Sequence, residues 1–96
     1  MRSLMEIKTA YDICQKTLSG KKFAEYTPYD RRLRFQRSAL RNCYESYQNF
    51  VLHKAEVLTW LPEMDQAGSD YQVVANTWRW CFGIIDELPV EFQRQR

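Results

Sequence analysis

Between Pro28 and Pro62 the apolar residues recur every three or four positions, and no glycine or proline interrupts them. This spacing places the apolar side chains on one face of an α-helix. Thr27 before Pro28 is a typical helix start, because threonine can cap the helix and proline suits its first position. Pro62 disfavours helical geometry in the residue before it. The sequence therefore predicts one helix over residues 28–61.

A continuous helix over residues 28–61 would be about 50 Å long at a rise of about 1.5 Å per residue. That length is large for a chain of 96 residues. A break near Asn42 or Asn49 is the alternative, and we prefer the single long helix.

Two further helices are indicated by their ends. Ser3 and Glu6 have the spacing of a capping box, and Gly20 is a typical residue beyond a helix C-terminus. Ser69 or Asp70 is expected to cap the last helix. The expected helices cover residues 3–19, 28–61 and 69–88, and residues 89–96 are expected to form a frayed tail.

The composition supports this all-α interpretation. Glycine and proline together number six in 96 residues, which permits long helices and disfavours an all-β meander. No apolar run reaches the roughly 18 residues of a membrane-spanning helix, and charged residues interrupt the N-terminal apolar positions, unlike in a signal peptide. We expect a single all-α domain in the cytoplasm, of three-helix-bundle type with a long basic central helix.

Residues that commonly perform catalysis or bind metals are sparse. His53 is the only histidine, and the chain lacks the G-x-S-x-G motif of serine hydrolases. Cys14, Cys43 and Cys81 are widely spaced, so neither a disulfide framework nor a zinc site is indicated. Their apolar neighbours predict buried thiols. The sequence thus predicts a protein that is not an enzyme and has no cofactor or metal.

Five arginines are concentrated in residues 31–41, a stretch without any acidic residue. A helix would place Arg34, Arg37 and Arg41 on one face, because they are spaced by three and four. Arg31 and Arg32 extend the charge into the first turn, where the helix dipole disfavours cations. Such clustering costs a few tenths of a kcal/mol per neighbouring pair, which suggests a role in binding. We call these five residues the arginine face.

The arginine face has three possible explanations. Guanidinium groups bind both carboxylates and phosphates in a bidentate manner, so an acidic protein surface and a nucleic acid both fit. The third is a solvated face, partly paired with acids of the same chain. Residues 1–41 carry ten Lys or Arg against four Asp or Glu, whereas residues 42–93 carry two against eight. Because the net charge is only +2 and no nucleic-acid-binding motif is present, a protein partner is favoured over a nucleic acid, and the solvated face stays open.

The predicted third helix is more apolar than a surface helix requires. Trp78 and Ile85 belong to its main apolar stripe, whereas Trp80 and Ile84 lie off that stripe. We expect Trp80 and Ile84 to be the more exposed pair and to contact a partner, because tryptophan often concentrates binding energy. The alternative is a central helix covered on both sides. Gly83 inside the helix would indicate close approach by another backbone.

Through the segments MRSLMEIKTAYDICQKTLSGKKF and NTWRWCFGIIDELP, the chain resembles the small, early-expressed accessory proteins of lambdoid phages, in particular the anti-RecBCD type. The resemblance implies a non-catalytic helical protein that binds the host RecBCD enzyme and modulates its nuclease and recombination activities. It assigns no role to individual residues. The alternative function is nucleic-acid binding through the arginine face at residues 31–41.

Overall fold

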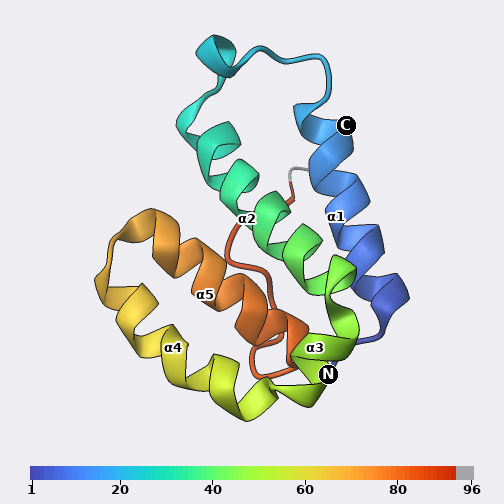
Figure 1. Cartoon of the computed structure of the whole chain (residues 1–96). Coiled ribbons are helices and arrows are strands. Elements are labelled where there is room, and N and C mark those ends of the chain that lie inside the picture. Colours follow the sequence, from blue (N-terminus) through green and yellow to red (C-terminus); the bar gives the residue numbers. More distant parts are fainter. Residues whose placement is uncertain (93–96) are drawn as a thin grey trace.

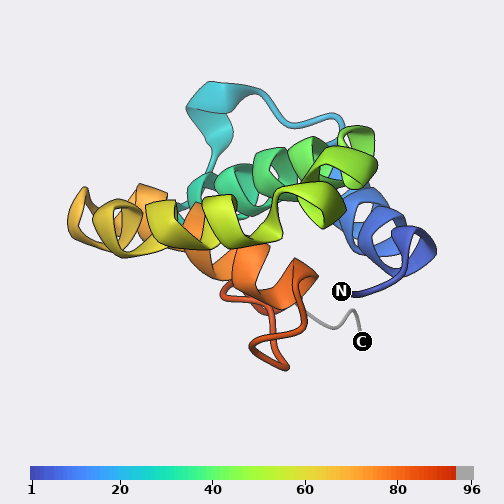
Figure 2. The ribbon, with the colours of Figure 1, turned by 60° about the horizontal axis from the view of Figure 1, so that its bottom comes forward.

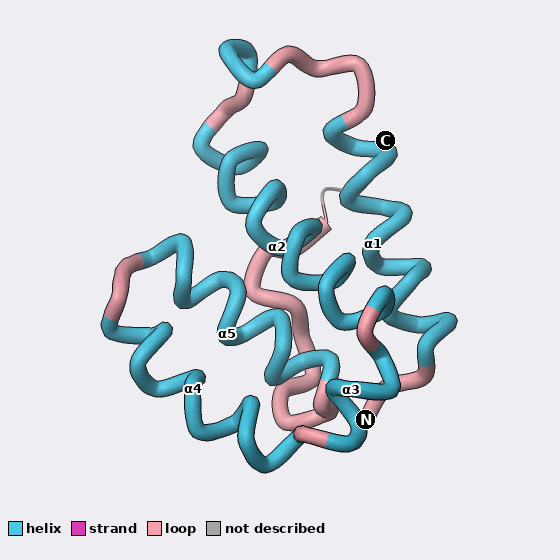
Figure 3. Tube along the Cα trace, in the orientation of Figure 1, coloured by secondary structure: helices cyan, strands magenta, loops and turns pink. Residues whose placement is uncertain are grey.

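The computed structural model describes residues 1–92, which form five α-helices and one short 3₁₀ helix (Figure 1). No strand occurs within these residues, so the all-α prediction is confirmed (Figure 3). The elements are α1 (Leu4–Leu18), η1 (Phe23–Glu25), α2 (Pro28–Glu45), α3 (Tyr47–Leu52), α4 (Lys54–Gln66) and α5 (Ser69–Cys81).

The first two helices begin with the predicted caps. The Ser3 hydroxyl accepts the Glu6 N–H at 3.2 Å, and the Glu6 carboxylate accepts the Ser3 N–H at 3.3 Å. Thr27 and Asp30 form the same reciprocal pair at 3.1 and 3.0 Å. The hydrogen bond from the Thr27 backbone and the nearby Lys21 ammonium lower the pKa of the buried Asp30 carboxyl. Both helix starts are thus determined by local residues.

The predicted continuous helix over residues 28–61 is wrong, because the chain bends at Ser46 and again at His53. Their φ and ψ angles are −116° and 33° at Ser46, and −108° and 25° at His53. The molecule measures 37 × 30 × 21 Å. A straight helix of about 50 Å would extend well beyond this body into solvent. The two bends instead turn α4 back, so that it packs against α5.

Pro62 does not end α4, which continues to Gln66. The last turn of α4 is held by Asp65, whose two carboxylate oxygens accept hydrogen bonds from the Arg79 guanidinium at 2.8 and 2.6 Å. This guanidinium lowers the pKa of the Asp65 carboxyl. The α4–α5 contact therefore overrides the local tendency of proline to disrupt the preceding turn.

The predicted helix 69–88 is also too long, because α5 ends at Cys81. Gly83 has a φ of 80° and donates to the Trp80 carbonyl at 3.0 Å, and the Ile84 N–H donates to the Arg79 carbonyl at 2.9 Å. This is a Schellman motif, which needs a left-handed residue after the helix. A Cβ at Gly83 would meet no atom within 4 Å. The glycine therefore ends the helix, and the predicted close backbone approach is wrong.

The start of α5 differs from the prediction as well. Gly68 occupies the N-cap position, and no side-chain hydrogen bond caps the helix there. Ser69 and Asp70, the predicted caps, lie within the first turn. Only Ala67 and Gly68 separate α4 from α5. Gly68, with a φ of 136°, stands at the position that a capping side chain would normally occupy.

Two helical hairpins make up the body of the fold. The connector of residues 19–27 joins α1 to the antiparallel α2, and α4 is followed by the antiparallel α5 (Figures 1 and 2). α2 packs against α1 and also against α5. The connector projects from the helical body in both views. The core is formed by buried residues that include Ile7, Cys14, Leu18, Leu33, Leu40, Cys43, Val73, Cys81 and Val90.

The predicted frayed tail is wrong for residues 89–92, which pack onto the core. Val90 is buried, and its N–H donates to Gln36 Oε1 at 2.8 Å. Gln36 Nε2 in turn donates to the Val90 carbonyl at 3.0 Å. The Tyr29 hydroxyl donates to the Glu91 carbonyl at 2.8 Å. The buried amide of Gln36 thus donates to and accepts from the backbone of Val90, as a neighbouring β-strand would. Residues 93–96 of the predicted tail lie outside the described range.

Replacing Gln36 by leucine is expected to release this segment. Leucine fills a similar volume but leaves the buried N–H and carbonyl of Val90 without partners, at roughly 1–3 kcal/mol each. The free energy of unfolding in urea should fall by at least about 2 kcal/mol. Amide hydrogen exchange at residue 90 should accelerate. Gln48→Leu, at an exposed position of α3, is the control and should change neither quantity; unchanged exchange in Gln36→Leu would contradict the role of the pair.

Candidate functional site

The arginine face follows one side of α2, from the connector towards α3. Arg31, Arg34 and Arg41 are exposed there, and Arg37 is half-buried beside α1. Arg32 is exposed but turns towards the tail, where it lines a shallow depression with Tyr29 and residues 89–92. The structure therefore brings four of the five predicted arginines to one side of the helix and separates Arg32 from them.

Few of these charges are neutralised by the fold. Arg41 Nε lies 3.0 Å from Glu45 Oε1, one turn further along α2. Arg37 Nη1 donates to Gln15 Oε1 of α1 at 3.1 Å, and this partner is uncharged. Within residues 1–92, Glu45 is the only carboxylate bonded to the arginine face. The predicted pairing with acids of the second half is thus limited to Arg41.

Arg34 is stacked between aromatic rings. Its guanidinium carbon lies 5.1 Å from the centroid of the Phe23 ring and 5.8 Å from that of Phe35. Phe23 belongs to η1 and is 61% exposed, although its ring also packs against Tyr26 at 5.4 Å. The sequence gives no signal for this exposure, because an aromatic residue in a connector usually packs inward. The result is an apolar ring beside the unneutralised cations.

Trp80 and Ile84 were the other predicted contact residues. Ile84 is 51% exposed and Ile85 is half-buried, which confirms the expected difference for the isoleucines. Trp80 and Trp78 are both half-buried, so the expected difference is not found for the tryptophans. Trp78 Nε1 donates to the Ala39 carbonyl of α2 at 3.1 Å, which anchors that ring between the hairpins.

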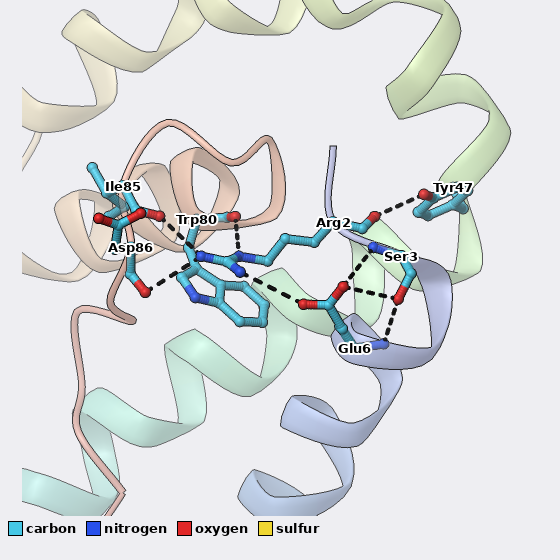
Figure 4. Close-up of polar contacts among 7 residues, drawn as sticks. All are labelled: Arg2, Ser3, Glu6, Tyr47, Trp80, Ile85 and Asp86. Atoms are coloured by element: carbon cyan, nitrogen blue, oxygen red, sulfur yellow. Dashed lines mark hydrogen bonds and ion pairs between the residues drawn. The ribbon is translucent and has the colours of Figure 1, made fainter.

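One face of the Trp80 ring is covered by Arg2, a residue that the sequence analysis missed (Figure 4). The Arg2 guanidinium carbon lies 4.3 Å from the ring centroid, and Nε donates to the Trp80 carbonyl at 2.8 Å. Nη2 donates to the carbonyls of Ile85 and Asp86, each at 3.3 Å. A cation is favourable at this position, because the helix C-terminus carries a partial negative charge.

The backbone of Arg2 completes this junction. Its N–H donates to the Cys81 carbonyl at 2.9 Å, and its carbonyl accepts the Tyr47 hydroxyl of α3 at 2.7 Å. Nη1 also lies 3.6 Å from Glu6 Oε2 of α1. Arg2 thus ties the N-terminus to α3 and to the end of α5. The sequence holds no local pattern for this role, because the partners lie up to 84 positions away.

Trp80 also contributes to an apolar groove of about 370 Å³. Met5 and Ile13 of α1, both exposed, form one wall, and Leu88 and Phe92 of the tail form the other. We call this the Trp80 groove. Trp80 is therefore accessible to a partner through this groove, although it does not stand out from the surface as predicted.

Removing the Arg2 side chain is expected to expose Trp80. Arg2→Ala loses the ring contact and the three carbonyl hydrogen bonds, which at this partly exposed site contribute about 2 kcal/mol together, so Tm should fall by roughly 8–16 °C. In a Trp60→Phe background, acrylamide quenching of the remaining tryptophan fluorescence should rise. Lys8→Ala, which removes an exposed cation from α1, should alter neither quantity. Equal quenching in Arg2→Ala and the parent would contradict the covering role of Arg2.

Other kinds of site find little support in residues 1–92. No group of three His, Cys, Asp or Glu side chains in this range could hold a metal ion. The same range has no helix whose length and apolar character suit a membrane crossing. The three cysteines are free and buried, as predicted, and burial raises the pKa of the Cys14 thiol to about 11.

Comparison with protein-family models, with curated proteins and with solved structures finds no match. The function is therefore argued from the arginine face, the Trp80 groove and the resemblance described above.

Proposed function

We propose that this protein is a non-catalytic binding module that engages an acidic surface of a partner protein through the arginine face. In this way it modulates the activity of that partner. The partner that we propose is the host RecBCD enzyme, because the sequence resemblance points to it. Trp80, through its groove, and the exposed Ile84 supply apolar contacts in addition to the charged ones.

The observation that carries the proposal is the incomplete neutralisation of the arginine face. Among its five guanidinium groups, Arg41 alone is bonded to a carboxylate within residues 1–92. Arg31 and Arg32 are exposed and have no ion pair in that range. Like charges at a helix N-terminus oppose folding slightly, so an acidic partner would relieve a repulsion that the isolated chain retains.

The surroundings of the arginine face favour a protein over a nucleic acid. Exposed acids of the second hairpin, such as Glu56, Glu63 and Asp70, would repel an extended phosphate backbone. Arg34 against the exposed Phe23 ring combines residue types that concentrate binding energy at protein interfaces. The same ring and guanidinium also suit base stacking, which supports nucleic-acid binding as the second candidate function.

The triple variant Arg34→Gln, Arg37→Gln, Arg41→Gln tests this proposal. Its Tm should be unchanged or slightly higher, because like-charge repulsion is relieved. Its effect on the nuclease rate of purified RecBCD, measured on linear duplex DNA, should require at least about tenfold more protein, since about 1.4 kcal/mol of lost binding is tenfold. An unfolded triple variant would instead show that these arginines are structural.

A matched pair of double variants separates specific contacts from total charge. Arg34→Gln with Arg41→Gln should weaken the effect on RecBCD, whereas Lys8→Gln with Lys16→Gln removes the same charge from α1 and should not. Direct binding to a duplex without RecBCD, measured between about 50 and 200 mM salt, tests the second function. Tight binding that falls log-linearly with salt, without any effect on RecBCD, would favour the nucleic-acid function.

A further inference from the structure

A second groove lies between α3 and α4, away from the arginine face and the Trp80 groove. It has a volume of about 290 Å³ and is lined by Phe50 of α3, by His53 at the bend, and by Glu56, Val57 and Trp60 of α4. Trp60 is 47% exposed, which is unusual for so large an apolar side chain. Within residues 1–92 its ring packs against no other aromatic ring. We call this the Trp60 groove.

One carboxylate, that of Glu56, lines the Trp60 groove. Glu56 is exposed, and Glu63 is exposed two turns further along the same helix. His53 Nδ1 lies 3.8 Å from Glu56 Oε2, so the imidazole offsets this charge only when it is protonated. The groove therefore offers an aromatic-lined hollow with the Glu56 carboxylate in its lining and Glu63 further along α4, and it fits an apolar side chain that is flanked by cations.

The same chain presents such a side chain at Phe23. The ring is 61% exposed on η1, in the connector that projects from the helical body (Figures 1 and 2). The Arg34 guanidinium lies 5.1 Å from its centroid, and Arg31 is exposed one turn earlier on α2. Phe23 is thus an aromatic projection with a cationic border, complementary in shape and charge to the Trp60 groove.

The two features cannot meet within one chain. The connector and the α3–α4 segment lie at opposite ends of the molecule in Figure 1, and its longest dimension is 37 Å. Two antiparallel copies, however, would bring each projection to the groove of the other copy. This arrangement uses the same contact twice and closes as a two-fold dimer.

We propose that two copies of this chain form such an antiparallel dimer, with Phe23 of each copy in the Trp60 groove of the other. Arg31 and Arg34 then face Glu56 and Glu63 across the contact. The interface is small and rich in exposed charge, so the dimer forms at a dissociation constant on the order of 100 µM at low salt and weakens as salt is added. The contact uses Arg31 and Arg34 of the arginine face, so in the dimer these two residues are not available to the partner suggested above.

Charge reversal on each side provides the sharpest test. One variant carries Arg31→Glu and Arg34→Glu, and the other carries Glu56→Arg and Glu63→Arg. Each alone sets like charges against each other and should sediment as a monomer. An equimolar mixture restores opposite charges at both contacts, so it should sediment at twice the chain mass of 11.6 kDa. Circular dichroism on each variant establishes that it is folded.

Trp60→Ala and Phe23→Ala test the apolar part of the contact without changing any charge. Each should weaken the wild-type dimer at least about tenfold in sedimentation equilibrium, since both contacts of the dimer are affected. A wild-type chain that stays monomeric up to about 1 mM at low salt would overturn the proposal. So would a mixture that fails to associate, or a dimer that persists unchanged in both charge-reversed variants.

The Glu56→Arg, Glu63→Arg variant also keeps this inference separate from the proposed function. It leaves every residue of the arginine face in place and releases Arg31 and Arg34 from the dimer contact, so its effect on RecBCD shows whether the monomer is sufficient for the proposed function. Loss of self-association with an unchanged effect on RecBCD is the expected result. A loss of both would show that the effect on RecBCD needs the dimer, and it would still support the contact.

Discussion

The side-chain amide of Gln36 pairs with both backbone groups of Val90 inside the core, and this pair determines how the fold is closed. Helices α1, α2 and α5 leave a space that no further helix fills, and the segment after α5 occupies it. An irregular segment can be buried only if its backbone polar groups find partners. Gln36 supplies both. No buried side-chain nitrogen or oxygen in residues 1–92 lacks a hydrogen-bond partner.

Features that depend on neighbouring residues were predictable from the sequence. The capping boxes at Ser3 and Thr27 and the end of α1 before Gly20 all involve groups within four positions of one another. The bends at Ser46 and His53 and the continuation through Pro62 were not predictable. They depend on how α4 meets α5, which local spacing does not record. Propensity is a weak guide wherever tertiary contacts compete with it.

The candidate site divides in the same way. Helical spacing was enough to place Arg31, Arg34, Arg37 and Arg41 on one side of α2. It could not indicate that Arg2 would cover Trp80, because a cation that caps a distant helix end leaves no periodic signal. The helix assumed over residues 69–88 also misplaced the side chains beyond Cys81, since the Schellman motif at Gly83 redirects the chain there.

The burial of Val90 has a consequence for synthesis of the chain on the ribosome. The N-terminal residues emerge first and can form α1 and α2, but the space beside Gln36 stays open until residues 89–92 have left the ribosome. Until then the amide of Gln36 has no backbone partner, and apolar side chains of the core face water. Completion of this fold therefore waits until the segment after α5 has emerged. A stalled or prematurely terminated chain would expose that open core to chaperones and proteases.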